Sequence, residues 1–292
     1  MERIFLKYNV SLRYTVDMTF AKKKFGQNFL KSEKALDAIT NASGIAGDSF
    51  VLEIGPGRGA LTKKLLETGA KVRALEIDPE MIAVLEEAFM KEIDSGQLEL
   101  IEGDIQKISP RELMGDAKEY SLVANIPYYI TGLIIRTFLE SDHAPTAMTL
   151  LVQKEVAIRI VDGHADGKRG KENILSLSVK AFGDVRYVAT VPSTAFVPAP
   201  RIDSAVIHIS HISHNKFKES DITPGEFFYV VKSAFAQKRK TLRNNLSQKG
   251  FEREEIEAVL IKMDIDLRVR AEDLTLEQWI ALTKNLGTSK KV

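Results

Sequence analysis

Short apolar runs alternate with amphipathic helical patterns along the part of the chain that begins at Phe50. An apolar run of about five residues is typical of a strand buried on both faces, and a 3.6-residue period between runs indicates crossover helices. The alternation therefore predicts an α/β fold with a mostly parallel sheet. Strands are expected at residues 50–54, 72–76, 98–102, 122–124 and 148–152.

Local signals refine this pattern. Asp78 followed by Pro79 provides an N-cap and a first-turn proline, so a helix should begin there and leave Glu76 at the carboxyl end of a strand. Two further β-like runs lie between residues 185 and 210, separated by the proline-rich loop 192–200. These two runs should close the sheet as a hairpin-like edge.

The pattern becomes helical after about His214 and stays so to the end. The apolar face of these helices should contain Phe228, Val231, Phe235, Leu242 and Leu246. We therefore expect a sheet domain over residues 18–213 and a small all-helical domain over 214–292. Residues 1–17 show no clear period and are interpreted as an N-terminal extension; alternatively, translation naturally starts at Met18.

Composition excludes several classes of protein. The 292 residues contain no Cys, which excludes disulfides, thiolate metal sites and cysteine nucleophiles and is compatible with a reducing cytoplasm. No apolar run approaches the roughly 20 residues that a membrane-spanning helix needs. We expect a soluble, cytoplasmic, monomeric protein without a membrane partner or a metal.

Charge is placed unevenly although the formal net charge is only +1. Binding of a polyanion depends more on where the charged residues lie than on the net charge of the protein. Taken alone, either cluster is explained equally well as part of an ordinary solvated surface. The two basic clusters are Lys22, Lys23, Lys24 and Lys31, and Lys238, Arg239, Lys240 and Arg243.

A glycine-rich loop follows the first predicted strand and is the first candidate site. Gly55, Gly57 and Ala60 also satisfy the loose G-x-G-x-x-G/A form, so an NAD(P) oxidoreductase is one interpretation. Glu53, just before the first glycine, disfavours it because a pyrophosphate would be repelled by a carboxylate there. An acid at this place is typical of loops that bind the amino-acid tail and ribose of S-adenosylmethionine.

Two more acids follow predicted strands. Glu76 is placed to accept hydrogen bonds from both hydroxyls of a ribose. Asp104 follows the next strand and is a candidate acceptor for an adenine amino group, with a surface turn as the alternative. Because open α/β sheets bind ligands at the carboxyl ends of their strands, Glu53, Glu76 and Asp104 together indicate an adenosine-containing ligand.

The segment after the fourth predicted strand carries the candidate chemistry. An exocyclic adenine nitrogen is a poor nucleophile because its lone pair is delocalised, so an enzyme must orient its two N–H groups. The side-chain oxygen of Asn125 and a backbone carbonyl near Ile126 or Pro127 supply two acceptors. Tyr128 is placed to stack on one face of the target base, and Phe196 is a candidate for the other face of that base. Ordinary packing in the core or in a loop is the alternative role for both residues.

Taken together, these motifs resemble the ribosomal RNA adenine dimethyltransferases, specifically the small-subunit dimethyladenosine transferase family. The resemblance extends from about Phe20 to Leu286. It is carried by residues 24–30, 53–59, 76–78, 103–104, 125–128, 153–157, 196–200 and 238–246.

The resemblance implies a Rossmann-like S-adenosylmethionine-dependent methyltransferase domain followed by a small helical domain that grips RNA. It implies dimethylation at N6 of two adjacent adenines in a hairpin near the 3′ end of small-subunit rRNA. The partner would be rRNA within an immature 30S-type subunit during ribosome biogenesis. The implied cofactor-binding residues are Asn28, Leu30, Gly55, Glu76, Asp104 and Asn125.

The second basic cluster is predicted to bind RNA. Its members are expected on consecutive turns of one helix whose other face is apolar, so that they project together toward phosphates. The cluster comprises Lys238, Arg239, Lys240 and Arg243.

Two departures from the most familiar bacterial pattern leave an alternative. Ile126 replaces a commoner Leu, and Tyr129 stands where Asn is often found, so the loop also approaches that of macrolide-resistance enzymes acting on large-subunit rRNA. The 238–246 segment weighs against these enzymes. A non-catalytic RNA-binding assembly or transcription factor on the same fold is a further alternative, disfavoured by the intact 125–128 loop.

Overall fold

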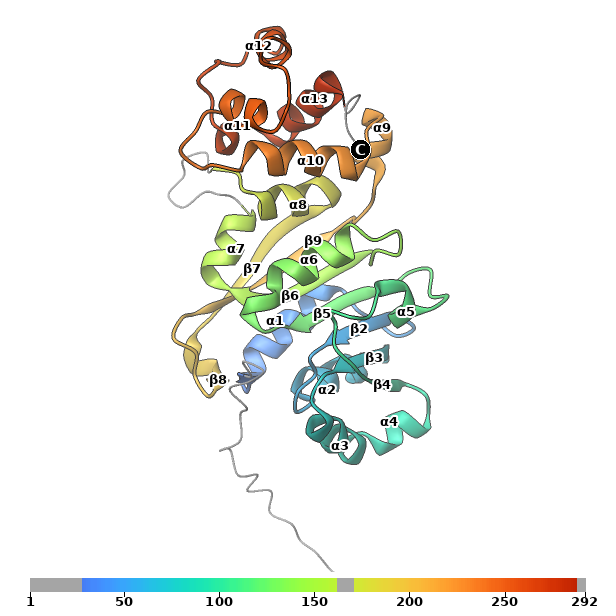
Figure 1. Cartoon of the computed structure of the whole chain (residues 1–292). Coiled ribbons are helices and arrows are strands. Elements are labelled where there is room, and N and C mark those ends of the chain that lie inside the picture. The colour runs from blue at the N-terminus through green and yellow to red at the C-terminus, as the bar shows by residue number, and fades with distance from the viewer. Residues whose placement is uncertain (1–27, 162–170, 288–292) are drawn as a thin grey trace, which may run out of the picture.

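The computed structural model describes residues 28–161 and 171–287 (Figure 1). The predicted extension 1–17, the cluster Lys22 to Lys24 and part of the 24–30 motif lie outside these residues. Within them, a seven-stranded sheet has the order β4-β3-β2-β5-β6-β9-β7. Its strands are β2 (Phe50–Ile54), β3 (Lys71–Glu76), β4 (Leu98–Glu102), β5 (Ser121–Asn125), β6 (Ala147–Gln153), β7 (Asp184–Val191) and β9 (Ser204–Ser210).

The predicted strand directions are confirmed. Strands β4, β3, β2, β5 and β6 run parallel, whereas β9 is antiparallel to both β6 and β7. The pair β7 and β9 therefore forms the expected antiparallel edge, with β7 outermost. A separate small sheet pairs β1 (Phe29–Leu30) with β8 (Phe196–Val197), which brings the amino-terminal segment against the proline-rich loop.

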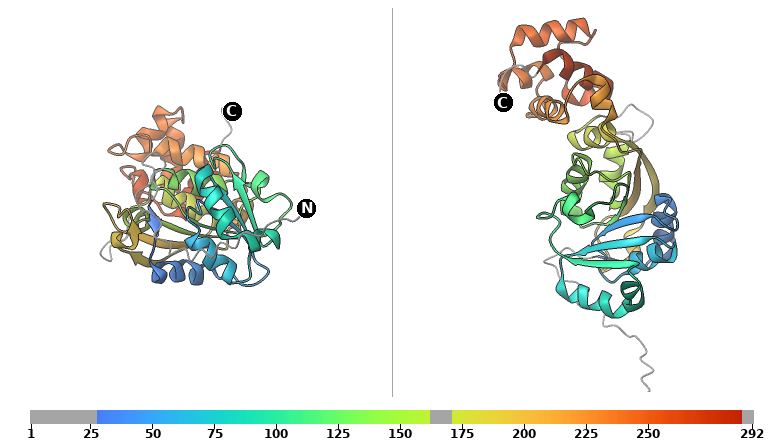
Figure 2. Two further views of the ribbon diagram at one scale, coloured as in Figure 1. Left: turned by 90° about the horizontal axis from the view of Figure 1, so that it is seen from below. Right: turned by 90° about the vertical axis from the view of Figure 1, so that its right-hand side faces the viewer.

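Alternate residues of the central strands pack into two separate cores. Leu52 and Leu122 belong to the core on one face of the sheet, while Val51 and Val123 belong to the other. This two-residue alternation of buried positions explains why the strands appear as continuous apolar runs. Helices accordingly lie on both sides of the sheet (Figure 2). They are α1 (Glu33–Ser43), α2 (Ala60–Glu67), α3 (Pro79–Ala88), α4 (Met90–Asp94), α5 (Pro110–Met114), α6 (Thr131–Leu139), α7 (Lys154–Val161) and α8 (Ile174–Phe182).

The carboxyl-terminal helices stack on one end of the sheet layer, next to α8 (Figure 1). Phe182 of α8 packs against Phe217, with ring centroids 5.0 Å apart, and Phe217 packs against Phe227 at 5.5 Å. Aromatic side chains thus join the helical part to the sheet part in one core. The helices are α9 (Asn215–Ser220), α10 (Pro224–Ala234), α11 (Leu242–Gln248), α12 (Arg253–Lys262) and α13 (Leu276–Leu286).

One prediction for this region is wrong. The basic cluster does not lie on one helix, because α10 ends at Ala234 and α11 begins only at Leu242. The buried Asn245 amide closes the intervening turn by donating to the carbonyls of Ala234 at 2.6 Å and Gln237 at 3.0 Å. Thr241 caps α11, since its side chain accepts a hydrogen bond from the Asn244 N–H. Residues 238–240 therefore lie in a turn.

Arg243 also differs from expectation. It lies in the first turn of α11, and its guanidinium donates to the Glu257 carboxylate at 2.8 Å. Only about a fifth of its side chain is exposed. Arg243 is thus an ion-pair partner between α11 and α12.

In the described part of the chain, no helix is long and apolar enough to cross a membrane. Nor do the described residues contain a cluster of three or more His, Cys, Asp or Glu that could hold a metal ion.

Candidate active site

The sheet changes its winding direction between β2 and β5. Strand β2 is followed along the chain by β3 on one side, while β5 pairs with its other side, with Ile54 opposite Ala124. A crevice forms at such a point, beyond the carboxyl ends of the strands. Gly55 directly follows β2, and Asn125 ends β5. The two turns that carry the chemistry therefore leave neighbouring strands at one edge.

A pocket of about 340 Å³ occupies this edge. The Gly55 and Asn125 turns both line this pocket, so the candidate cofactor loop and the candidate catalytic loop open into one cleft. Other sequence-predicted residues in its wall are Asn28, Leu30, Glu53, Glu76, Asp104, Pro127, Tyr128 and Phe196. Phe29, Lys31, Arg58, Ile77 and Ile105 line it as well and were not predicted as site residues.

Glycines let the first turn approach its surroundings closely. Gly57 has φ +57°, and a Cβ there would lie 3.1 Å from the Phe29 ring. Gly59 has φ +81°, and a Cβ there would lie 2.4 Å from the Phe89 ring. Since L side chains rarely adopt this backbone conformation and space is lacking, the turn requires glycine at both places.

The Glu76 carboxylate is fixed by backbone donors. Its Oε2 accepts from the Gly57 N–H at 3.0 Å, and its Oε1 accepts from the N–H groups of Ile77 at 2.9 Å and Asp78 at 3.0 Å. Three bonds use most but not all of the roughly four lone-pair directions of a carboxylate. The side chain thus links the first turn to the end of β3 and keeps acceptor capacity in the pocket wall.

Glu53 is the most deeply buried acid of the site, with 1% of its surface exposed. Its Oε2 has no hydrogen-bond partner among the described residues. Burial, and to a lesser degree the negative charge of Glu76, raises the pKa of the Glu53 carboxyl to about 8. Near neutral pH, this side chain is therefore largely protonated.

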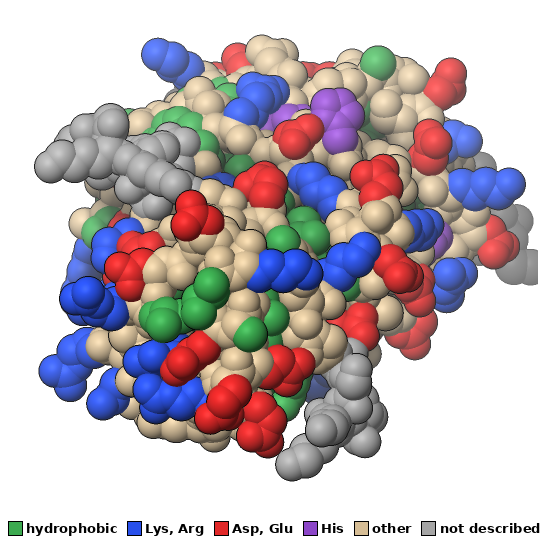
Figure 3. All heavy atoms as spheres, turned by 90° about the horizontal axis from the view of Figure 1, so that it is seen from above, with side chains coloured by type: hydrophobic (Ala, Val, Ile, Leu, Met, Phe, Trp, Pro, Cys, Tyr) green, Lys and Arg blue, Asp and Glu red, His purple; other side chains and the backbone are tan. Residues whose placement is uncertain are grey.

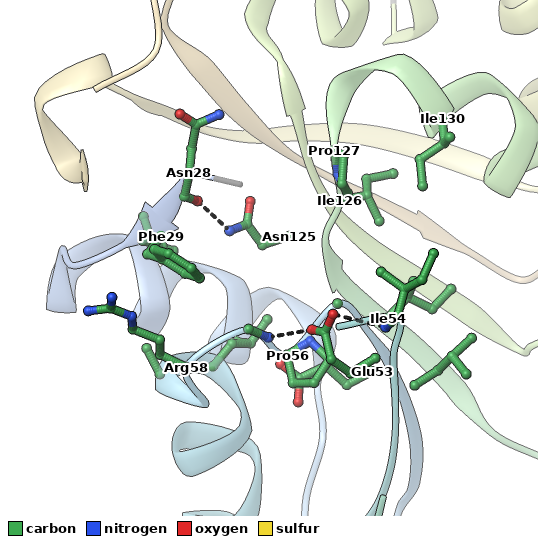
Figure 4. A pocket seen from close by; sticks show the side chains of 18 of the residues that line it. Asn28, Phe29, Glu53, Ile54, Pro56, Arg58, Asn125, Ile126, Pro127 and Ile130 are labelled. Atoms are coloured by element: carbon green, nitrogen blue, oxygen red, sulfur yellow. Dashed lines mark hydrogen bonds between the residues drawn. The ribbon is translucent and has the colours of Figure 1, made fainter. Parts of the chain in front are cut away.

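Asn125 is oriented by the amino-terminal segment. Its Nδ2 donates to the Asn28 carbonyl at 3.5 Å, which leaves Oδ1 as the acceptor end of the amide. In Figure 4 a dashed line joins the Asn28 backbone carbonyl to the Asn125 amide, while the Asn28 side chain points away from Asn125. The pairing of β1 with β8 holds Asn28 in this place, since Phe29 lies opposite Val197.

The two predicted aromatics differ in burial. Tyr128 is half-buried, and its hydroxyl shares a 2.7 Å hydrogen bond with Ser204 Oγ at the start of β9. Burial raises the pKa of the Tyr128 phenol, against the opposing effect of this bond, so the phenol is neutral. Phe196 is only 2% exposed and meets the pocket at its wall.

Arg58 and Phe29 form a contact that the sequence did not indicate. The Arg58 guanidinium lies 4.7 Å from the centre of the Phe29 ring, a cation–π distance. Figure 4 shows Phe29 above Arg58 at the pocket. Both residues fall inside predicted motifs, but only the folded chain brings them together.

Comparison with known proteins decides the family. The family model described as ribosomal RNA adenine dimethylase matches residues 18–287. The chain belongs to this family. It is similar to a ribosomal RNA small subunit methyltransferase A of Dehalococcoides mccartyi strain CBDB1, at 40% identity over 89% of this chain and 86% of that protein. The protein of that name from Lactobacillus johnsonii is 39% identical over 90% and 89%.

Solved structures agree with this fold. A dimethyladenosine transferase from Plasmodium falciparum is 27% identical with a TM-score of 0.70, covering 87% of this chain and 95% of that one. The 23S rRNA methyltransferase ErmE, at 24% identity and a TM-score of 0.68, covers 89% and 99% and shares the fold. The enzyme is thus an S-adenosylmethionine-dependent rRNA adenine dimethyltransferase with a Rossmann-like sheet.

The pocket residues fit this cofactor. Adenosine needs acceptors for ribose hydroxyls and an adenine amino group, and the enzyme places the Glu76 and Asp104 carboxylates in one wall. The Asp104 side chain is held by the Gln106 N–H, which donates to its Oδ1 at 3.0 Å. Ile77 and Ile105 add apolar surface beside these acids. Glu53 is largely protonated near neutral pH, so the repulsion of a pyrophosphate that the sequence predicted for its carboxylate is weakened in the folded protein.

Proposed function

We propose that the enzyme methylates N6 of two adjacent adenines in a hairpin near the 3′ end of small-subunit rRNA, within an immature 30S-type subunit in the cytoplasm. The observation that carries the proposal is the shared pocket of the Gly55 and Asn125 turns. The relatives named small subunit methyltransferase A, which match nearly nine-tenths of the chain, support the small-subunit target.

Asn125 orients the nucleophile. Its Oδ1 accepts one N–H of the adenine amino group, and a backbone carbonyl near Ile126 or Pro127 accepts the other. The Asn28 carbonyl favours the orientation of the Asn125 amide in which Nδ2 lies beside it and Oδ1 is the free acceptor. Two fixed acceptors direct the nitrogen lone pair away from themselves and into the pocket.

Tyr128 holds the base. Its hydroxyl is tied to Ser204, so the ring has a defined plane before RNA arrives. A base removed from its stack gains about 1–3 kcal/mol from an aromatic face. Phe196 contributes the opposite wall, although its small exposed area limits the contact. The pocket therefore selects a single flat base.

The cofactor-binding set comprises the remaining pocket residues. Gly55 leaves room for the amino-acid tail, Glu76 accepts from the ribose hydroxyls and Asp104 accepts from the cofactor's adenine. Asn28 and Leu30 cover the cofactor from the amino-terminal segment, while Asn125 lies between cofactor and target base. When bound, S-adenosylmethionine supplies an electrophilic methyl group on a sulfonium. No general base is required, because the proton lost from N6 passes to solvent afterwards.

RNA phosphates are bound by the turn between α10 and α11. Lys238, Arg239 and Lys240 in this turn are exposed. Arg243 supports the turn through Glu257 instead of contacting RNA directly. We accordingly assign residues 18–213 to a methyltransferase domain and 214–292 to an RNA-binding domain, and we propose that the enzyme acts as a monomer.

Transfer of tritiated methyl groups to immature small subunits tests the function. We expect labelled N6,N6-dimethyladenosine at two adjacent positions near the 3′ end, located by mass spectrometry of rRNA fragments. Large-subunit RNA serves as the control substrate. Label only in large-subunit RNA would replace the proposal by the macrolide-resistance type of activity, and no label in either RNA would leave a non-catalytic RNA-binding protein.

A further inference from the structure

Two consecutive tyrosines at the pocket point in different directions. Tyr128 is half-buried with its hydroxyl on Ser204, whereas 68% of the Tyr129 surface is exposed. Tyr129 nevertheless belongs to the residues that line the pocket. It therefore lies at the rim, with most of its ring facing outward.

The backbone that carries Tyr129 is fixed. Residues Tyr128–Ile130 form the 3₁₀ helix η2, in which the Ile130 N–H donates to the Pro127 carbonyl at 3.2 Å. Ile130 itself is buried in the core beneath, and α6 continues directly from η2. An aromatic ring held outward by a rigid backbone loses little conformational freedom when a partner binds it.

A second exposed apolar residue lies nearby in the chain. Leu133 follows four residues later in the first turn of α6 and is 41% exposed. A single exposed apolar residue is ordinary on protein surfaces, but an exposed aromatic ring at the rim of a base-binding pocket is a platform for a second base.

The proposed RNA substrate indicates which group covers the Tyr129 ring. The pocket receives one adenine, so the nucleotide next to it in the RNA chain must lie at the pocket mouth. Every single-stranded base can stack on an exposed aromatic ring, and the strength of the stacking depends on the base. We infer that Tyr129 stacks on the base adjacent to the target adenine, as Tyr128 does on the target itself. This inference rests on the proposed function.

Two adjacent adenines are thereby stacked on two adjacent tyrosines, one on each ring. When one adenine lies in the pocket against Tyr128, its neighbour is retained at Tyr129. Exchange of the two bases then requires a movement of one nucleotide and no release of the RNA. Tyr129 accordingly raises both the affinity for RNA and the fraction of RNA molecules modified at both adenines in one encounter.

A coupling experiment tests the stacking. Wild type and Tyr129→Ala are assayed on immature small subunits with the natural pair of adenines and on subunits in which one adenine is replaced by uracil, the weaker stacking base. On the natural pair we expect Tyr129→Ala to lower kcat/KM about 10-fold, from the usual contribution of one stacked base. On the uracil-containing subunits we expect a loss of only about 2-fold, because uracil stacks poorly on the ring to begin with.

Two further variants separate stacking from other effects. Tyr129→Phe keeps the ring and should retain the wild-type values on both substrates. Met90→Ala is the matched control, since Met90 is 60% exposed in α4, which leads into the amino end of β4. It should change neither value, and all variants should bind S-adenosylmethionine with unchanged affinity.

Equal losses for Tyr129→Ala on both kinds of subunit would overturn the inference, because the ring would then not sense the neighbouring base. A fraction of doubly modified RNA that stays at the wild-type level would also count against it. Failure of the wild type to methylate any subunit is a different outcome and would reject the proposed function as well.

Discussion

Asn125 illustrates how a single side chain is prepared for catalysis. Its amide is held by the Asn28 carbonyl at 3.5 Å, and its backbone oxygen lies near Gly55. We expect Asn125→Ala to lower the single-turnover rate by about 10²-fold or more, the usual effect of removing one positioned hydrogen-bonding group. The dissociation constant for S-adenosylmethionine, measured by calorimetry, should change by only a few-fold. A near-normal turnover rate would mean that Asn125 does not hold the nucleophile.

Glu53 makes stability depend on pH. Its carboxyl stays protonated in the folded protein up to about pH 8, whereas in the unfolded chain it ionises near its ordinary pKa of 4.5. Between these values the unfolded state binds fewer protons, so the free energy of unfolding falls as pH rises. Glu53→Gln mimics the protonated form and should remove this fall. In urea denaturation, the free energy of unfolding of the variant relative to that of the wild type should rise from about pH 5 to about pH 8. The rise should be at most about 1.4 kcal/mol for each unit by which the pKa is shifted.

Glu112→Gln is the matched control for this experiment. Hydrogen bonds from Ser109 lower the pKa of the Glu112 carboxyl, which is therefore ionised throughout that pH range. The control should show no pH-dependent gain. An equal response of both variants would exclude burial of Glu53 as the cause.

At the scale of elements, the turn between α10 and α11 depends on one buried amide. Asn245 closes it through the Ala234 and Gln237 carbonyls. We expect Asn245→Ala to lower the free energy of unfolding by about 1–3 kcal/mol, because the buried Ala234 carbonyl loses its Asn245 donor and the Gln237 carbonyl keeps only the Lys240 N–H. Urea denaturation measures this loss. Asn244→Ala changes the same residue type in the same helix without those bonds and should be neutral; comparable losses would show that the turn does not depend on Asn245.

At the scale of the whole molecule, RNA affinity depends on where charge lies. Figure 3 looks onto the end formed by the carboxyl-terminal helices, where Lys and Arg side chains are intermixed with Asp and Glu. A face of mixed sign exerts little long-range attraction, so binding relies on local contacts with phosphates. The exposed turn residues Lys238, Arg239 and Lys240 are the candidates for these contacts.

A salt series measures their contribution. Replacing Lys238, Arg239 and Lys240 by Ala should weaken RNA binding and reduce the slope of log affinity against log salt by about 0.7–0.9 for each phosphate that the variant no longer neutralises. Gln237→Ala, in the same turn, leaves the charge unchanged and should keep the wild-type slope. An unaltered slope in the triple variant would mean that other residues bind the phosphates.

Much of the sheet was predictable because its signals are local. Five apolar runs identified the parallel strands to within a residue or so, and the Asp78 and Pro79 signal located the start of α3. The same reasoning failed between Phe235 and Leu242. There the apolar spacing continued, but α10 ends at Ala234, Thr241 caps the start of α11, and the Asn245 side chain bonds the turn between them. The spacing of apolar residues alone does not reveal a turn that is closed by a side chain several residues further along the chain.

The order of strands and helices along the chain, the glycine turn and several of the residues that line the pocket could be predicted from the amino-acid sequence, because each depends on neighbours in the chain. Folding of the whole chain was needed to establish that β5 lies beside β2, that Asn28 reaches Asn125, and that Tyr128 turns inward while Tyr129 turns outward. The ion pair between Arg243 and Glu257 is likewise a contact that only the folded chain establishes. These arrangements depend on residues far apart in sequence, and packing of the complete molecule selects them.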